Sequence, residues 1–178
     1  DVVVNRLPNR FVPSSGRAGP GAVEAIEELT STMASHDAFV IFPEGGNFTE
    51  KRRARAIAKL GEIGRPDLAE RAELMELLLP PKPKGALAAL DGAPGADILI
   101  VGHVGLEELT TVRDIWRGIP MDTQVFAAFW VIRHEDVPTG AAREAWLYDQ
   151  WEDLNTWVGE ARQRRAVVRA AENSAPEA

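Results

Sequence analysis

The stretch Ile41-Phe42-Pro43-Glu44-Gly45-Gly46-Asn47-Phe48-Thr49 is the part of this sequence on which the predicted architecture depends most. It completes an unbroken apolar run, residues 38–42, which predicts a short buried strand. A carboxylate and two glycines follow at once, and glycine lets backbone N–H groups approach an anion closely. Ligands of α/β proteins bind beyond the carboxyl ends of strands. The stretch therefore predicts a strand that delivers a binding loop.

Outward from this stretch, helical and strand patterns alternate. The spacing of apolar residues predicts helices over about 22–34, 50–60, 65–79, 85–90 and 141–158, and a short helix or turn over 110–116. Apolar runs predict two further strands, over 98–103 and 124–133. This alternation indicates an α/β domain with a mostly parallel or mixed central sheet flanked by helices. We assign residues 1–160 to it and residues 161–178 to a charged tail that frays.

Composition excludes several classes of function. The chain has 178 residues, enough for one domain with a core, and a formal net charge of −7, which argues against a nucleic-acid partner. It has no cysteine, which excludes disulfides, thiolate nucleophiles and cysteine-ligated zinc. No His, Asp and Glu spacing points to another metal site. No window approaches the roughly 20 apolar residues that span a bilayer.

Cations follow the Gly-Gly pair directly, at Lys51, Arg52, Arg53 and Arg55. A carboxylate, a flexible turn and cations together suit a phosphorylated head group that also carries hydroxyls. Glu44 would accept a hydrogen bond from a hydroxyl, and backbone N–H and guanidinium groups would take the phosphate. A solvated surface turn followed by an exposed basic helix has the same composition, so both interpretations stay open here.

Several blocks, in order, resemble the 1-acylglycerol-3-phosphate acyltransferase family. Phe42–Gly45 is similar to its Phe-Pro-Glu-Gly-Thr-Arg block, and Phe48–Lys51 resembles the continuation in the lysocardiolipin-acyltransferase-like branch. Leu77–Gly85 resembles that branch's Leu-Leu-x-Pro-Arg-x-x-Gly block. Three short blocks resemble its tail, namely Val131–Arg133, Asp136–Pro138 and Ala145–Leu147, so the resemblance covers about residues 41–151.

The resemblance implies a glycerol-3-phosphate acyltransferase-like fold and an O-acyltransferase. Such an enzyme moves a fatty acyl group from acyl-CoA or acyl-carrier-protein to the hydroxyl of a lysophosphatidate or lysophospholipid. The thioester is a substrate, so neither a prosthetic cofactor nor a metal is implied. The expected partners are the lysophospholipid acceptor, the acyl thioester donor and a membrane surface, and the expected location is the cytoplasmic face of a membrane.

The resemblance also implies a set of substrate-binding residues. In the family the Glu-Gly-Thr-Arg block binds the glycerol phosphate of the acceptor, and the Leu-Pro block helps to build the acyl or acceptor pocket. The threonine and arginine of the first block are Gly46 and Asn47 here, so Arg52 or Arg53 substitutes for the arginine, or the acceptor differs. The expected residues are Glu44, Gly45, Gly46, Asn47, Arg52, Arg53, Pro81 and Gly85.

The family's catalytic base is the histidine of a His-x-x-x-x-Asp motif, which this sequence lacks. His103, followed five residues on by Glu108, is nearest to it, but a strand-end histidine is the more ordinary interpretation. His36 and His134 are expected at the surface, at the boundaries of elements. We therefore expect the base upstream of Asp1 and expect this chain alone to be inactive. The alternative is a non-catalytic lipid- or partner-binding module with the same fold.

Three tryptophans, Trp146, Trp151 and Trp157, lie on the predicted helix 141–158. Such residues suit a membrane interface, where indoles are favoured. A stripe of aromatic side chains at helical spacing is more often part of a core, and core packing is the interpretation we prefer.

Overall fold

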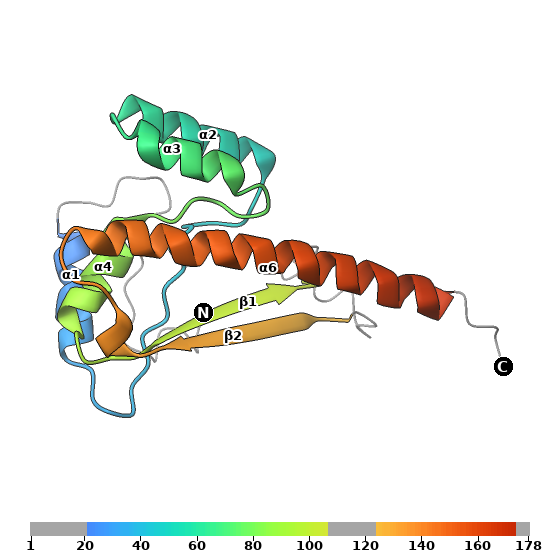
Figure 1. Cartoon of the computed structure of the whole chain (residues 1–178). Helices are drawn as coiled ribbons and strands as arrows, with labels where there is room; N and C mark the ends of the chain where they lie inside the picture. Colours follow the sequence, from blue (N-terminus) through green and yellow to red (C-terminus); the bar gives the residue numbers. More distant parts are fainter. Residues whose placement is uncertain (1–20, 107–123, 174–178) are drawn as a thin grey trace, which may run out of the picture.

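A computed structural model describes residues 21–106 and 124–173 (Figure 1). In these ranges the chain combines helices with a two-stranded sheet. The elements in chain order are α1 (Ala22–Ser31), α2 (Glu50–Glu62), α3 (Pro66–Leu74), α4 (Pro83–Gly92), β1 (Ile98–Val104), β2 (Phe126–Ile132), the 3-10 turn η2 (His134–Asp136) and α6 (Ala142–Asn173).

The two strands pair antiparallel, and one face of the pair packs on α6. Gly102 of β1 allows this approach, because a Cβ there would lie 2.7 Å from Leu154 Cδ1 and 2.9 Å from the Trp157 ring. Trp157 also meets Trp130 of β2 edge to face, with ring centroids 5.5 Å apart. The sheet thus packs against the long helix α6 (Figure 1).

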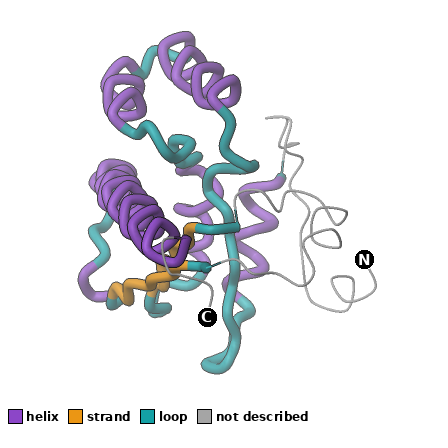
Figure 2. Tube along the Cα trace, turned by 90° about the vertical axis from the view of Figure 1, so that its right-hand side faces the viewer, coloured by secondary structure: helices purple, strands orange, loops and turns teal. Residues whose placement is uncertain are grey.

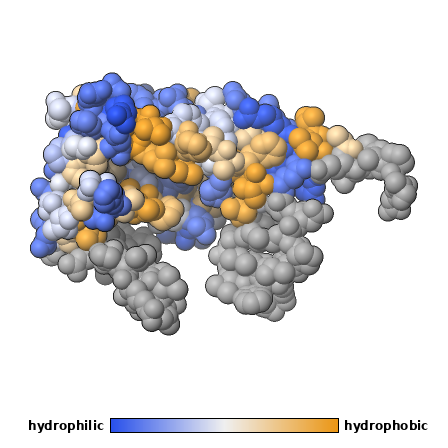
Figure 3. All heavy atoms as spheres, turned by 90° about the horizontal axis from the view of Figure 1, so that it is seen from below, coloured by the Kyte–Doolittle hydropathy of each residue, from blue (hydrophilic) through white to orange (hydrophobic). Residues whose placement is uncertain are grey.

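The opposite face of the sheet stays largely exposed. The register pairs Leu99 with Val131 and Val101 with Phe129, and all four side chains are exposed. In the view from below, apolar patches interrupt a largely hydrophilic surface (Figure 3).

The main core lies between α3, α4 and the first half of α6. Trp151 is buried in it and Trp146 packs against it, while Trp157 packs against a second cluster around Val104. The tryptophans of α6 therefore serve packing, as predicted. The buried members of the main cluster are Leu68, Ala72, Met75, Ala86, Leu147, Tyr148 and Trp151.

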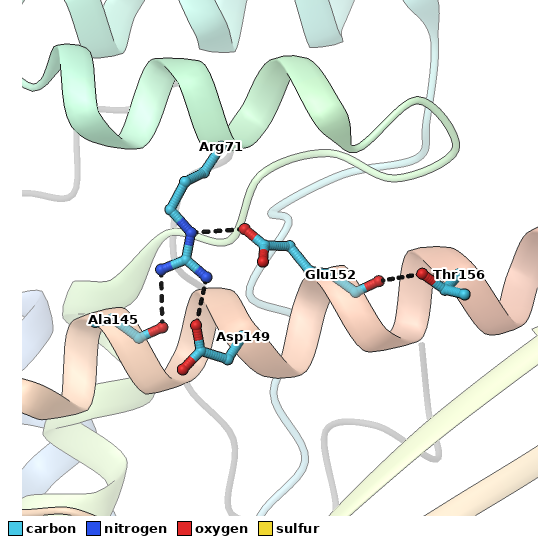
Figure 4. A network of polar contacts seen from close by, with 5 residues as sticks. All are labelled: Arg71, Ala145, Asp149, Glu152 and Thr156. Carbon is cyan, nitrogen blue, oxygen red and sulfur yellow. Dashed lines mark hydrogen bonds and ion pairs between the residues drawn. The ribbon is translucent and has the colours of Figure 1, made fainter.

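Charged side chains hold α3 against α6 (Figure 4). Arg71 Nε donates to Glu152 at 2.6 Å, Nη2 to Asp149 at 2.5 Å and Nη1 to the carbonyl oxygen of Ala145 at 3.1 Å. Side-chain hydrogen bonds to both carboxylates raise the pKa of Arg71. Because α2 and α3 form a helical hairpin, this anchor fixes the hairpin on the body of the molecule.

The prediction of a strand over residues 38–42 is wrong. This segment has no ladder partner among the described residues, and Val40 and Phe42 are 72% and 80% exposed. Ile41 instead reaches the space beside Gly85 and Ile26, so one side of an extended chain packs while the other meets solvent. A short apolar run does not by itself separate the two states. The sheet of the described residues is accordingly antiparallel, not parallel or mixed as predicted.

Other elements match the prediction in kind and differ in length. Thr49 caps α2 as expected, since its hydroxyl accepts from the backbone N–H of Arg52 at 3.2 Å. Helix α3 ends at Leu74, earlier than predicted, and α6 continues to Asn173, through the segment expected to fray. The predicted turn over 110–116 lies outside the described residues. Across the described ranges, no helix combines the length and the apolar character that a membrane span requires.

Candidate functional site

Two loops far apart in sequence meet next to Glu44. The backbone N–H of Lys82 donates to the carbonyl oxygen of Pro43 at 2.9 Å. The backbone N–H of Leu79 donates to Glu44 Oε2 at 3.1 Å, across 35 residues of sequence. The Pro-Glu-Gly-Gly turn and the Leu-Pro-Pro-Lys connector, which sequence analysis picked out separately, are therefore one structural unit. Figure 2 shows these teal connections joining the helical hairpin to the body.

The turn has a shape that only glycine supplies at low cost. The N–H of Gly45 donates to the carbonyl oxygen of Phe42 at 3.0 Å, which closes a four-residue turn. Gly45 has φ +68°, in the left-handed region. The turn thus presents backbone next to Glu44, and residues 45 and 46 themselves add no side chain there.

Glu44 is half-buried in this unit. Burial raises the pKa of its carboxyl above the ordinary value, and the hydrogen bond from Leu79 opposes part of that rise. A carboxylate has several acceptor positions, and the Leu79 bond uses one of them on Oε2. Glu44 therefore retains acceptor capacity for a ligand hydroxyl.

Lys82 is a member of the site that sequence analysis missed. Its ammonium lies against Gly45, in the space that a Cβ of residue 45 would occupy, and its Cε would be 3.2 Å from that Cβ. The signal was present in the sequence. Lys82 stands where the resembled Leu-Leu-x-Pro-Arg-x-x-Gly block has its arginine, so a cation was to be expected at this position.

Arg52 covers the second glycine. Its Nη1 donates to the carbonyl oxygen of Asn47 at 2.9 Å, and lies 3.0 Å from the position of a Cβ on Gly46. Of the two arginines expected to replace the missing one, Arg52 is thus next to the turn. One cation lies against each glycine of the Gly-Gly pair.

Arg53 is engaged elsewhere. Its Nε donates to the carbonyl oxygen of Met75 at 2.7 Å, and its Nη2 donates to those of Glu73 and Ala72 at 2.6 and 3.4 Å. These carbonyls lie at the C-terminal end of α3, where a cation is favoured. Arg53 therefore ties α2 to α3 and is not beside the turn.

The remaining expected residues have supporting positions. Pro81 is buried in the connector. Gly85 lies where α4 approaches α1, with Ile41 and Ile26 side chains 3.4 and 3.5 Å from the place of a Cβ. Asn47 is exposed and contributes its backbone carbonyl to Arg52. These three residues shape the unit rather than add charge to it.

Among the described residues, the histidines contribute no hydrogen bond to this unit. His36 and His134 are exposed, as predicted, and His103 is exposed on β1. His134 begins η2 as expected of a boundary residue, whereas His36 lies in a turn between α1 and α2, because the strand predicted after it does not form. His134 Nδ1 lies 3.2 Å from Asp97 Oδ1, and hydrogen bonds from the backbone and ring of His134 hold the pKa of Asp97 below its usual value. Glu108 lies outside the described residues. Within the described ranges, no three His, Asp or Glu side chains gather as metal ligands do.

Comparison of the chain with protein-family models, with curated proteins and with solved structures finds no match.

Proposed function

We propose that this chain is the acceptor-binding part of an O-acyltransferase of glycerolipid synthesis or remodelling, with a glycerol-3-phosphate acyltransferase-like domain at the cytoplasmic face of a membrane. One observation carries the proposal. The turn at Glu44 and the connector at Lys82, which resemble two separate blocks of that family, are hydrogen-bonded to each other. The contact places a half-buried carboxylate, exposed backbone and two cations together.

Each group has a task in binding a lysophosphatidate or lysophospholipid. The phosphate would lie against the Gly45–Gly46 backbone, with Lys82 and Arg52 supplying charge-assisted hydrogen bonds. Glu44 would accept from a hydroxyl of the glycerol and so orient the acceptor. Orientation of a reacting hydroxyl is itself a large contribution to rate.

The transfer step needs one further group. The acceptor hydroxyl attacks the carbonyl carbon of the acyl thioester, its proton passes to a base, and the thiolate of CoA or of the carrier protein leaves as the ester forms. In the resembled family that base is the histidine of a His-x-x-x-x-Asp motif, which this sequence does not contain. In this proposal the described residues of the site bind and orient the acceptor, and a separate group supplies the base.

Titration of the chain with glycerol 3-phosphate and with a short-chain lysophosphatidate tests the proposal. Lys82→Gln should weaken binding by about ten-fold or more, because a charge-assisted hydrogen bond contributes roughly 1.5–3 kcal/mol. Lys84→Gln is the matched control, since Lys84 is an exposed lysine in the first turn of α4, two residues after Lys82. Equal affinity of the Lys82 and Lys84 variants would remove Lys82 from the site.

A non-catalytic lipid- or partner-binding module is the second candidate, favoured by the absence of the histidine motif. An acyl-transfer assay on the native protein separates the two candidates. Acyl transfer to lysophospholipid that is lost in Glu44→Ala supports the enzyme. Binding of the same acceptor with no transfer supports the module.

A further inference from the structure

Helix α2 carries a row of cations on its solvent side. Lys51, Arg55 and Lys59 are spaced four residues apart, which places them along one face, and Arg52 lies beside the first of them. All four side chains are exposed. The other side of the helix is committed to packing, because Ile57 and Leu60 contact the core cluster. We call the exposed side the cationic face of α2.

The charge of this face contrasts with that of the whole chain. Five lysines and arginines lie between Glu50 and Glu62, while the chain has a formal net charge of −7. Lys59 pairs with Glu62 at 3.2 Å, so Glu62 compensates one of these charges. Lys51, Arg52 and Arg55 remain, and the face therefore stays positive.

The face is too long for a single anion. Eight residues separate Lys51 from Lys59, which corresponds to about 12 Å along a helix axis. A row of this length suits a surface with repeated negative groups. Its first turn includes Arg52, which lies against Gly46 of the candidate site.

Exposed apolar side chains lie near both ends of the row. Phe42, two residues before Glu44, is 80% exposed, and Ile63, at the end of α2, is 57% exposed. Cations together with exposed apolar side chains are typical of surfaces that bind anionic bilayers, where the charges meet head groups and the apolar groups enter the interface. The formal net charge of −7 argues against a nucleic acid as the partner.

We propose that the cationic face of α2 docks the protein on an anionic lipid surface. The inference extends the proposed function, because it places the bilayer at the helix that begins beside the acceptor turn. The inference rests on the proposed function in one respect, the identity of the lipid that reaches the candidate site. Docking itself requires neither acyl transfer nor a lysophospholipid.

Vesicle co-sedimentation tests the docking. The chain is mixed with vesicles of phosphatidylcholine and phosphatidylglycerol, and separately with phosphatidylcholine alone, at low and at physiological salt. We compare Lys51→Gln/Arg55→Gln with Arg164→Gln/Arg169→Gln, a control pair that removes two exposed cations from α6. With roughly 1 kcal/mol for each cation near a charged membrane, the α2 pair should bind the mixed vesicles about 30-fold more weakly. The α6 pair should change binding by far less.

Three results would overturn the inference: equal loss from both pairs, equal binding to neutral vesicles, or tighter binding to a DNA duplex than to the anionic vesicles. Circular dichroism of each variant checks that it is folded. Glu44→Gln separates this inference from the proposed function, because it should weaken binding of soluble lysophosphatidate and leave vesicle binding unchanged. If the chain binds lysophosphatidate but does not bind vesicles, the docking inference is refuted and the proposed function is not.

Discussion

Gly45→Ala tests the geometry of the candidate site in two separate ways. Gly45 has φ +68°, and an alanine in the left-handed region costs about 1 kcal/mol or slightly more. In addition, the new Cβ would take the space of the Lys82 ammonium, so the lysine has to swing away. The first effect lowers the stability of the fold, and the second removes a cation from the turn.

Gly64→Ala isolates the backbone cost. Gly64 has φ +76°, close to that of Gly45, and nothing lies within 4 Å of the place of its Cβ. Both variants should lose a similar amount of stability, about 1–2 kcal/mol in urea unfolding. Lysine is flexible, so its displacement adds little to that loss.

Binding should separate the two variants. We expect Gly45→Ala to weaken glycerol 3-phosphate binding by about ten-fold or more, because one charge-assisted hydrogen bond is lost, and Gly64→Ala to leave it unchanged. In a Lys82→Gln background the binding penalty of Gly45→Ala should largely vanish, which is the result expected of coupled residues. Full affinity in Gly45→Ala, or an undiminished penalty in the double variant, would refute the placement of Lys82 at the turn.

Three further predictions concern Glu44, the α2–α3 hairpin and the packing of the sheet on α6. Burial raises the pKa of Glu44 in the folded state, so the folded state binds this proton more tightly than the unfolded chain does. The free energy of unfolding should therefore fall as pH rises from the ordinary carboxyl pKa through the raised value. Urea midpoints measured across pH check this, and Glu44→Gln should lack the fall. Arg53→Met removes the hydrogen bonds to the end of α3 and should cost about 1–3 kcal/mol in urea unfolding with head-group affinity retained, whereas a large loss of affinity would return Arg53 to the site. Gly102→Ala places a Cβ 2.7 Å from Leu154 and should cost about 1–3 kcal/mol, and a second change, Leu154→Ala, should cost less in that background than in the unaltered chain.

Helices with a cap or an amphipathic pattern were predictable from the sequence. Thr49 before a run of good helix formers places the start of α2, and the apolar spacing of α6 predicts both its existence and its buried face. The end of α6 was not predictable in this way. Residues 161–173 carry charges without a breaker, so composition alone does not separate a solvated helix from a frayed tail.

The residues 38–42 show the limit of reading strands from sequence. Five apolar residues before a proline fit a buried strand, but a strand also needs a partner edge, and β1 pairs with β2 in the described residues. The segment alternates packed and exposed side chains without a ladder. Pairing depends on the rest of the chain, so a local pattern does not predict it.

Lys82 and Arg53 show the corresponding limit for the site. Arg53 and Arg52 are neighbours with the same chemistry, yet helix geometry turns one towards α3 and the other towards the turn. Lys82 is 37 residues from Gly45 and enters the site only because Pro43 and Glu44 bind the connector. Sequence identified the kinds of groups, and tertiary packing chose which members of each kind meet.

The position of the α2–α3 hairpin explains why the site forms at all. The chain leaves the site after Gly46 and returns to it at Leu79, so the whole hairpin is the loop that joins the two halves of the site. A loop of this length carries an entropic cost of closure, and that cost falls if the loop is itself ordered. Arg53 joins α2 to α3, and Arg71 fixes α3 to α6. These contacts set the direction in which the connector leaves α3 towards Glu44. The cations at the turn therefore depend on contacts distant from it, which is why binding and hairpin stability have to be measured separately.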